Sequence, residues 1–200
     1  QAFFNLTCFR IVFHGKRFNF MSLEIYQTVN EDMKIHVMEL YHESFGKGFS
    51  AQHIDSLWLS GFMDFVFEKG EVWVAVENGY LLAVLLAHSL IYDKDFPAKL
   101  MTDDAKNHCI YISDLMVASV ARKKGIGELL TSTFLDAMKM KSYDQSVIRV
   151  WDQNLPALHL YEKLGFESFA QILQTKHKPE SLDKTFEMKK IYLRKSLKQS

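Results

Sequence analysis

The sequence predicts a mixed α/β fold in which helices cover both faces of one sheet, and three observations lead to this prediction. Strand-like and helix-like patterns alternate along the chain in the order β-α-α-β-β-β-α-β-α-β-β. Of the 200 residues, 48% are hydrophobic and 14% are aromatic, which is enough for a substantial core. Only 9 Gly and 3 Pro are present, which favours long regular elements over linkers. We expect a single α/β domain.

The N-terminal half supplies a strand, two helices and a β-hairpin. Asn30 is placed as the N-cap of the first helix, and apolar residues then recur at helical spacing as far as Gly46. Asn78-Gly79 is a strong two-residue signal for a hairpin turn. The predicted elements are a strand at 23–29, helices at 31–46 and 51–68, and strands at 71–77 and 80–92.

The C-terminal half begins with a polar segment, 93–108, which we expect to be a long loop. The strand at 109–117 is apolar on both faces except at Ser113 and Asp114, which is typical of a central strand covered on both sides. A second polar connection is expected at 175–185. The remaining predicted elements are helices at 125–141 and 154–164 and strands at 146–151, 166–174 and 186–193.

The charge balance narrows the possible partners. Lys and Arg total 24, and Asp and Glu also total 24, so no net field draws the chain to nucleic acid or to an anionic membrane. The two cysteines, Cys8 and Cys109, form no C-x-x-C pair, which favours a reducing, cytoplasmic location. The longest apolar stretch is shorter than the roughly 20 residues of a membrane helix. We therefore expect no nucleic-acid or membrane partner, and any bound anion must be held by a local cluster.

Two regions are expected along the chain. Residues 1–20 are an N-terminal extension to which we assign no function: an upstream extension, a vector-derived remnant or an accessory strand. Residues 21–195 form a single domain.

A basic, glycine-containing turn precedes the helix at 125–141. Three consecutive cations, Arg122, Lys123 and Lys124, stand where the positive end of the helix dipole disfavours them. A bound anion removes this conflict. Gly125 and Gly127 allow the backbone to approach that anion closely, and the free N–H groups of the first helical turn can donate to it. A solvated basic turn is the alternative interpretation of the same residues.

Two motifs together resemble the superfamily of acetyl-CoA-dependent N-acetyltransferases (GNAT). The first is Leu115-x-Val117 followed by Arg122-x-x-Gly125-x-Gly127. The second lies on the next helix and consists of Asn154, Ala157, Tyr161, Glu162, Lys163, Leu164, Gly165 and Phe166. In element order the resemblance covers about 23–193, whereas the residue-level motifs lie within 114–166.

The resemblance implies a GNAT-like fold: a mostly antiparallel, twisted sheet of about six or seven strands with a splayed central pair, and about four helices on both faces. It also implies direct transfer of an acetyl group from acetyl-CoA to a primary amine in a ternary complex. The residues that it assigns to acetyl-CoA are Leu115, Met116, Val117, Arg122, Lys123, Lys124, Gly125, Ile126, Gly127, Asn154 and Tyr161.

Two residues are candidates for catalysis. The resemblance makes Tyr161 the general acid for the departing thiolate, although an aromatic residue on this helix face is also typical of a core. Asp114 is a carboxylate in an apolar strand, so it is either the base or substrate-orienting group, or a buried structural hydrogen-bonding residue. A related polyamine-acetylating branch has Glu where this chain has Ser113, which weakens a polyamine assignment.

The acceptor pocket is expected between the first two helices, with Phe45, Phe49 and Asp114 as candidate substrate contacts and 93–108 as a further wall. No His or Cys spacing typical of a metal site is present, so we expect no metal. Members of the family commonly form homodimers. Two alternatives remain open: a catalytically silent acyl-CoA-binding module of the same fold, and transfer of another acyl group.

Overall fold

The computed structural model describes residues 10–15, 20–47 and 51–198. Its central sheet has eight strands in the order β1-β2-β3-β4-β5-β6-β8-β7. Every neighbouring pair is antiparallel except β5 and β6, which are parallel. The strands are β1 (Arg10–Gly15), β2 (Phe20–Gln27), β3 (Glu71–Glu77), β4 (Tyr80–Ser89), β5 (Cys109–Val117), β6 (Gln145–Trp151), β7 (Glu167–Lys178) and β8 (Ser181–Ser196).

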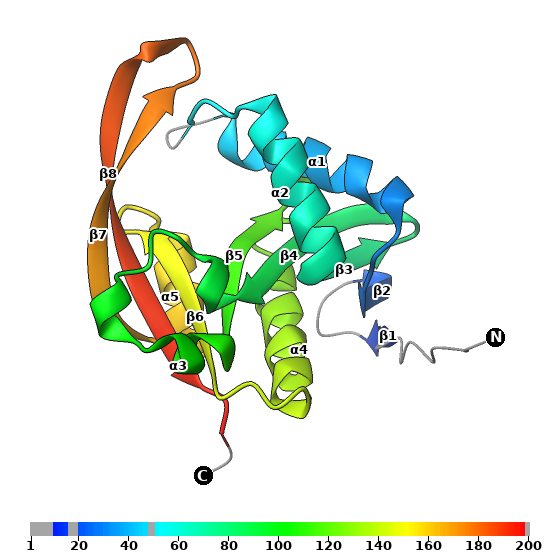
Figure 1. The fold of residues 1–200 in the computed structure, drawn as a ribbon. Helices are drawn as coiled ribbons and strands as arrows, with labels where there is room; N and C mark the ends of the chain where they lie inside the picture. Colours follow the sequence, from blue (N-terminus) through cyan, green and yellow to red (C-terminus); the bar gives the residue numbers. More distant parts are fainter. Residues whose placement is uncertain (1–9, 16–19, 48–50, 199–200) are drawn as a thin grey trace, which may run out of the picture.

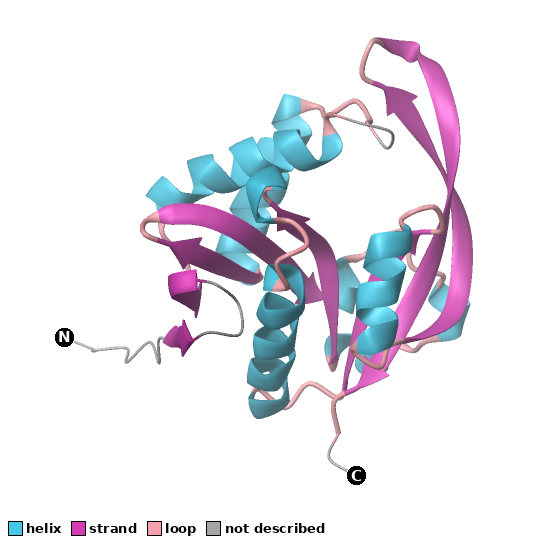
Figure 2. Ribbon diagram, turned by 180° about the vertical axis from the view of Figure 1, so that it is seen from behind, coloured by secondary structure: helices cyan, strands magenta, loops and turns pink. Residues whose placement is uncertain are grey.

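Helices cover both faces of this sheet, which confirms the predicted fold class. In Figure 1, α2 lies in front of β3 and β4, and α4 lies in front when the molecule is seen from behind in Figure 2. One buried cluster joins α1 and α2 to the sheet, and a second joins α4 and α5 to the opposite face. The helices are α1 (Glu31–Phe45), α2 (Ser56–Lys69), α3 (Asp103–Asn107), α4 (Ile126–Met140) and α5 (Leu155–Lys163).

Local sequence signals explain where these elements begin and turn. The side chain of Asn30 accepts a hydrogen bond from the backbone N–H of Asp32 and caps α1, as predicted. Asp55 caps α2 in the same way, by accepting from Trp58 N at 2.7 Å. Asn78 and Gly79 both have positive φ, 50° and 80°, as the tight β3–β4 hairpin requires.

Strand β1 belongs to the N-terminal extension, outside the predicted domain. Arg10 pairs with Tyr26 and Phe13 with Leu23, so β1 is an antiparallel edge strand on β2. This pairing favours the accessory strand among the three interpretations of the extension. Seven of the eight strands lie in the predicted domain, in agreement with the expected number.

The expected loop at 175–185 is wrong, because strands run through it. β7 extends to Lys178 and β8 starts at Ser181, so the two strands form one long hairpin with only Pro179 and Glu180 between them. Most side chains of its outer part are polar and exposed, so no hydrophobic alternation marks it in the sequence. Figure 1 shows its tip beside the α1–α2 connection, where His53 N donates to His177 O at 2.8 Å.

The segment 93–108 is also more ordered than a simple loop. It contains a 3₁₀ turn at Ala98–Leu100 and the short helix α3, and it follows another 3₁₀ turn, Leu90–Tyr92, at the end of β4. Thr102 caps α3 by accepting from Ala105 N at 3.3 Å. In the part of the chain that the structure describes, no helix is long and apolar enough to cross a membrane.

The fold predicts opposite effects for two glycine substitutions. Gly70 ends α2, and a Cβ atom there would lie 2.6 Å from Ala87 O and 2.9 Å from Val66 O. Since these are backbone atoms, Gly70→Ala should lower the free energy of unfolding by about 1–3 kcal/mol. Gly61 lies within α2, where a Cβ atom would meet nothing within 4 Å, so Gly61→Ala should raise it by about 0.5–1 kcal/mol. Urea denaturation measures both values, and equal effects of the two substitutions would contradict this prediction.

Candidate active site

The sheet opens between β5 and β6. The two strands pair through only four residue pairs, from Cys109↔Gln145 to Ile112↔Ile148. Beyond these pairs β5 stays with β4 as far as Val117, while β6 stays with β8 as far as Trp151. The splayed central pair is therefore observed as predicted, and the edge of β5 that faces β6 has no strand partner there among the described residues.

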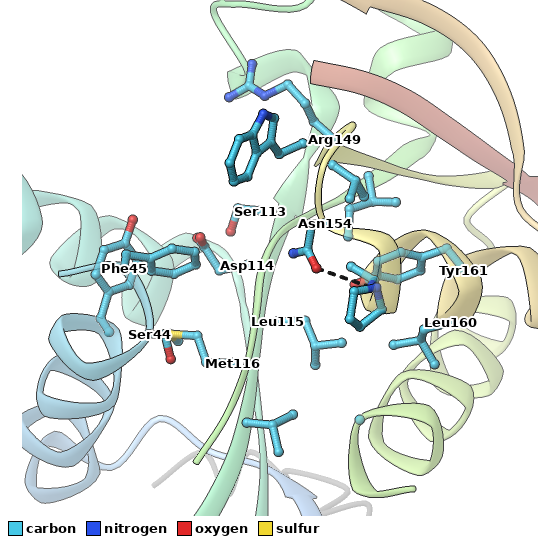
Figure 3. Close-up of a pocket in the computed structure, with 18 of the residues that line it drawn as sticks. Ser44, Phe45, Ser113, Asp114, Leu115, Met116, Arg149, Asn154, Leu160 and Tyr161 are labelled. Atoms are coloured by element: carbon cyan, nitrogen blue, oxygen red, sulfur yellow. Dashed lines mark hydrogen bonds between the residues drawn. The ribbon is translucent and has the colours of Figure 1, made fainter. Parts of the chain in front are cut away.

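A large cleft occupies this opening. Its volume is about 2170 Å³, compared with roughly 300–1,000 Å³ for a pocket that holds one small ligand. Residues of β5, the turn before α4, β6, α5, α1 and the β7–β8 hairpin line it. Figure 3 shows that Leu115 points to the side of β5 where α5 lies, whereas Met116 and Asp114 point to the side of α1. The cleft therefore has room for two substrates, one on each side of β5.

The basic turn lies at one end of the cleft. Gly125, at φ 78°, is the N-cap of α4 and provides no side-chain cap, so the first N–H groups of the helix are available to a ligand. Arg122, Lys123 and Lys124 are exposed, and of these three Arg122 and Lys123 line the cleft. Arg122 also donates from Nε to Val117 O at 3.1 Å. These groups are placed where they could bind an anion, and the anion site stays a prediction.

Gly127 lies where α4 approaches the end of β5. A Cβ atom there would be 3.4 Å from Val117 Cγ2 and 3.7 Å from Leu115 Cδ2, and it would also meet Leu160 of α5 at 3.9 Å. The glycine therefore lets α4, β5 and α5 pack closely at the base of the cleft. Ile126 is itself buried, so only its backbone can contact a ligand.

Helix α5 presents the second motif to the cleft. Asn154 is the N-cap of α5, and its side chain accepts from Ala157 N at 3.3 Å (Figure 3). Tyr161 lies further along α5 and is only 1% exposed, with its ring edge-on to Phe166 at 5.4 Å between ring centroids. Both Asn154 and Tyr161 line the cleft. Tyr161 is thus a core aromatic and a cleft residue at once, which combines the two interpretations of it.

The pKa of the Tyr161 phenol is raised well above its ordinary value, mainly by burial and also by the negative charge of Asp114. The hydroxyl is therefore neutral at any assay pH. A neutral phenol can donate a hydrogen bond to a developing negative charge, but it gives up its proton reluctantly.

A β-bulge sets the direction of Asp114. Leu86 of β4 pairs with Asp114 and Ala87 pairs with Ile112, so Ser113 is an extra residue in β5. The hydroxyl of Ser113 donates to Leu86 O at 3.1 Å. Because of the extra residue, Ile112 and Leu115 face the α4 side together, and Asp114 faces the α1 side. Regular alternation would have turned Asp114 toward α4.

Burial raises the pKa of Asp114 to about 6, against the opposing effects of the Ser113 hydroxyl and the positive charges of Lys190, Arg149 and Lys176. The carboxyl is therefore mostly ionised at neutral pH, and its pKa is close enough to neutral pH for it to accept a proton. Phe45, at the end of α1, lies on the same side of β5 (Figure 3) and also lines the cleft. The other predicted acceptor contact, Phe49, lies outside the described residues.

Sequence reasoning missed three cations on the acceptor side of the cleft. Arg149 comes from β6, Lys176 from β7 and Lys190 from β8, and all three line the cleft. Arg149 donates to Asp95 Oδ2 at 3.0 Å, to Asp93 Oδ1 at 3.5 Å and to the Tyr192 hydroxyl at 3.0 Å. These contacts hold the predicted 93–108 wall against the sheet. No local motif marks these cations, because they are isolated residues on three strands.

No three His, Cys, Asp or Glu side chains of the described residues are placed to hold a metal ion. Cys109 is a free, buried thiol at the start of β5, and burial raises its pKa to about 12, so it is a poor nucleophile.

The splayed sheet and the uncapped start of α4 agree with the fold of the GNAT superfamily that the motifs resemble. The family model for the acetyltransferase (GNAT) family matches residues 34–166, and the chain belongs to this family. It is thereby an N-acetyltransferase by class.

Solved structures share the fold at low sequence identity. An N-acetyltransferase from Staphylococcus aureus Mu50 superposes with a TM-score of 0.67 at 17% identity, covering 88% of this chain and 99% of that chain. The ribosomal-protein-alanine N-acetyltransferase from Brucella melitensis superposes with a TM-score of 0.65 at 15% identity, covering 86% of this chain and 98% of that chain. yncA from Salmonella typhimurium, whose structure contains its cofactor acetyl-CoA, superposes with a TM-score of 0.66 at 17% identity. The match covers 89% of this chain and 95% of that chain. No curated protein sequence matches the chain.

The raised pKa of Asp114 predicts a pH-dependent gain in stability on substitution. The folded state holds this proton more tightly than the unfolded state, so the contribution of Asp114 to stability is full below about pH 4 and is lost as pH rises past about 6. Asp114→Asn removes the ionisation. The variant should therefore gain about 2 kcal/mol in unfolding free energy, relative to wild type, between pH 4 and pH 7.5. Urea titrations at both pH values measure this gain, and a pH-independent difference would refute the assignment.

Proposed function

We propose that the protein transfers the acetyl group of acetyl-CoA directly to a primary amine of an acceptor, with both substrates bound in the cleft at once. The observation that carries the proposal is the position of the two chemical groups on either side of β5. The basic, uncapped start of α4 offers donors and positive charge for phosphates, and Asp114 offers a proton acceptor on the opposite side.

The cofactor side fits a long ligand with an anionic end. The first N–H groups of α4, Arg122 and Lys123 would bind the pyrophosphate of acetyl-CoA. The edge of β5 at Leu115, Met116 and Val117, which has no strand partner among the described residues, would hold the pantetheine arm by backbone hydrogen bonds and polarise the thioester carbonyl. Asn154, at the start of α5, would contact the same arm.

Transfer then requires two protons to leave the amine nitrogen, one before attack and one after it, and one negative charge to be stabilised. An ordinary alkylamine has a pKa near 10.4 and is protonated at pH 7, so Asp114, directly or through water, would accept its proton. The freed amine nitrogen forms a bond to the carbonyl carbon, the carbon–sulfur bond breaks, and the nitrogen releases its second proton to solvent. The hydroxyl of Tyr161 would stabilise the departing thiolate, which takes up a proton from that hydroxyl or from solvent.

The direct experiment mixes the protein with acetyl-CoA and a panel of amines that includes polyamines, amino acids, aminoglycosides and peptide N-termini, and follows the release of free thiol. Release above background with any amine supports the proposal. Tight binding of acetyl-CoA without release on any amine would favour the catalytically silent module. Faster release from succinyl-CoA or propionyl-CoA would reassign the acyl group.

The basic turn predicts a selective loss of cofactor affinity. Arg122→Gln combined with Lys123→Gln removes two cations next to the helix terminus, so KM for acetyl-CoA should rise about 10-fold or more with little change in kcat. Steady-state kinetics with varied acetyl-CoA measures this effect. Lys139→Gln removes the same kind of charge from the other end of α4 and should change neither constant. If Lys139→Gln raised KM for acetyl-CoA as much as the double substitution does, the loss of affinity would reflect the total charge of the protein and not the basic turn.

Tyr161→Phe tests the role of the hydroxyl. The ring stays packed on Phe166, so the variant should remain folded. We expect kcat to fall roughly 100-fold while KM for acetyl-CoA stays nearly constant, because only stabilisation of the departing thiolate is lost. Unchanged turnover would remove Tyr161 from the mechanism.

A further inference from the structure

The β7–β8 hairpin presents one face to the acceptor side of the cleft. Gln174 and Lys176 are two residues apart on β7, so their side chains lie on the same face of the hairpin. The same holds for Met188 and Lys190 on β8. Gln174 is directly opposite Met188 in the hairpin register, so these side chains share a face. All four line the cleft. The hairpin therefore contributes two ammonium groups to the acceptor side.

These two lysines lack the counter-ions that buried cations usually have. No carboxylate of the described residues lies within 4 Å of the ammonium of Lys176 or Lys190. Both side chains are half-buried. Burial, with the added repulsion of Arg149, lowers the pKa of both lysines, that of Lys190 to about 8, although Asp114 acts on both in the opposite direction. Two partly desolvated positive charges thus face the cleft without an anion in contact.

The carboxylates of Asp93 and Asp95, in the segment 93–108 beside the lysines, already accept hydrogen bonds from other residues. Asp93 accepts from the Tyr192 hydroxyl at 2.9 Å as well as from Arg149. Asp95 accepts from Arg149 at 3.0 Å and from the Gln174 side chain at 2.6 Å. Neither carboxylate is within ion-pair distance of the lysines. Asp114 is the cleft carboxyl whose raised pKa suits it to accept a proton from the amine of an acceptor.

The cleft is also bounded at this end. The hydrogen bond from His53 N to His177 O joins the α1–α2 connection to the hairpin, and Gln52 and Lys176 line the cleft beside it. A wall formed by two elements restricts the approach of a folded protein surface. A small acceptor fits this arrangement better than the terminus of a folded protein.

We propose that the acceptor is a small molecule that carries an anionic group, a carboxylate or a phosphate, near its reacting amine, and that Lys176 and Lys190 bind this group while Asp114 faces the amine. The anion would supply the counter-charge that the two lysines lack. This inference rests on the proposed function, because it identifies the substrate class of the same site.

The test compares matched acceptors that differ in one anionic group. The pairs are phenylalanine with phenethylamine, lysine with cadaverine, and phosphoethanolamine with ethanolamine, and a peptide amide with an N-terminal Glu represents peptides. Thiol release from acetyl-CoA gives kcat/KM for each. We expect kcat/KM for at least one anion-bearing member to exceed that of its partner without the anion by about 10-fold or more. The phosphate pair and the carboxylate pairs distinguish the two anions.

Substitutions assign this preference to the lysines. Lys176→Gln and Lys190→Gln should each lower kcat/KM for the preferred anion-bearing acceptor by about 10- to 100-fold, mainly through KM, and should lower that of the partner without the anion by much less. Lys189→Gln is the matched control, because Lys189 is the exposed neighbour of Lys190 on the opposite face of β8 and does not line the cleft. It should have no effect. Equal rates within every pair, a preference that survives both substitutions, or a preference for the peptide would overturn the proposal.

A binding measurement separates this proposal from the proposed function. Calorimetry with and without CoA compares N-acetylphenylalanine with N-acetylphenethylamine, which need no turnover to bind. Tighter binding of the anionic compound, lost in Lys176→Gln and Lys190→Gln, without turnover of any amine would remove the proposed function and keep the anion site. Turnover that does not distinguish the acceptors with and without the anion, together with equal affinities for the two acetylated compounds, would keep the proposed function and remove the anion site.

Discussion

The divergence of β5 from β6 is the constraint on which the rest of this structure depends. A strand inside a sheet satisfies its backbone groups on both edges, and β5 gives up one of those edges after Ile112. The divergence is maintained because each strand keeps its other neighbour. Among the described residues, the α1–α2 cluster packs only on the β5 side of the opening, whereas the α4–α5 cluster packs on the opposite face and joins both sides of it. The unpaired edge, the cleft and the access of α4 to it all follow from this one opening.

The zero net charge of the chain conceals an uneven arrangement in space. Arg122 and Lys123 line the cleft beside the start of α4, Lys176 and Lys190 line it on the β7–β8 hairpin, and the ionisable Asp114 lies on the α1 side of β5. Arg149 is instead neutralised by Asp93 and Asp95. Local charge therefore decides what each end can bind, since a balanced total provides no long-range attraction.

The regular elements could be predicted wherever burial imposes a period on the sequence. Strands β3 and β5 and helices α1 and α4 appear close to the predicted positions, because each packs apolar residues against a core. The outer β7–β8 hairpin did not follow this rule, since its outer part buries little. The basic turn of the candidate site was predictable because its residues are consecutive. Lys176 and Lys190 were not, because the hairpin pairing that places them on one face runs through the segment 175–185, where the sequence predicted a loop.

The sequence by itself determined the order of the elements, the glycines and cations before α4, and the family motifs, because each depends on residues that are near one another in the chain. Tertiary structure decided the direction of Asp114 and the character of the acceptor side. The extra residue at Ser113 exists only in relation to the register of β4, and it turns the carboxyl toward α1. Likewise, the two lysines face the cleft because the hairpin crosses to the α1–α2 connection, a contact between segments more than 100 residues apart in the sequence.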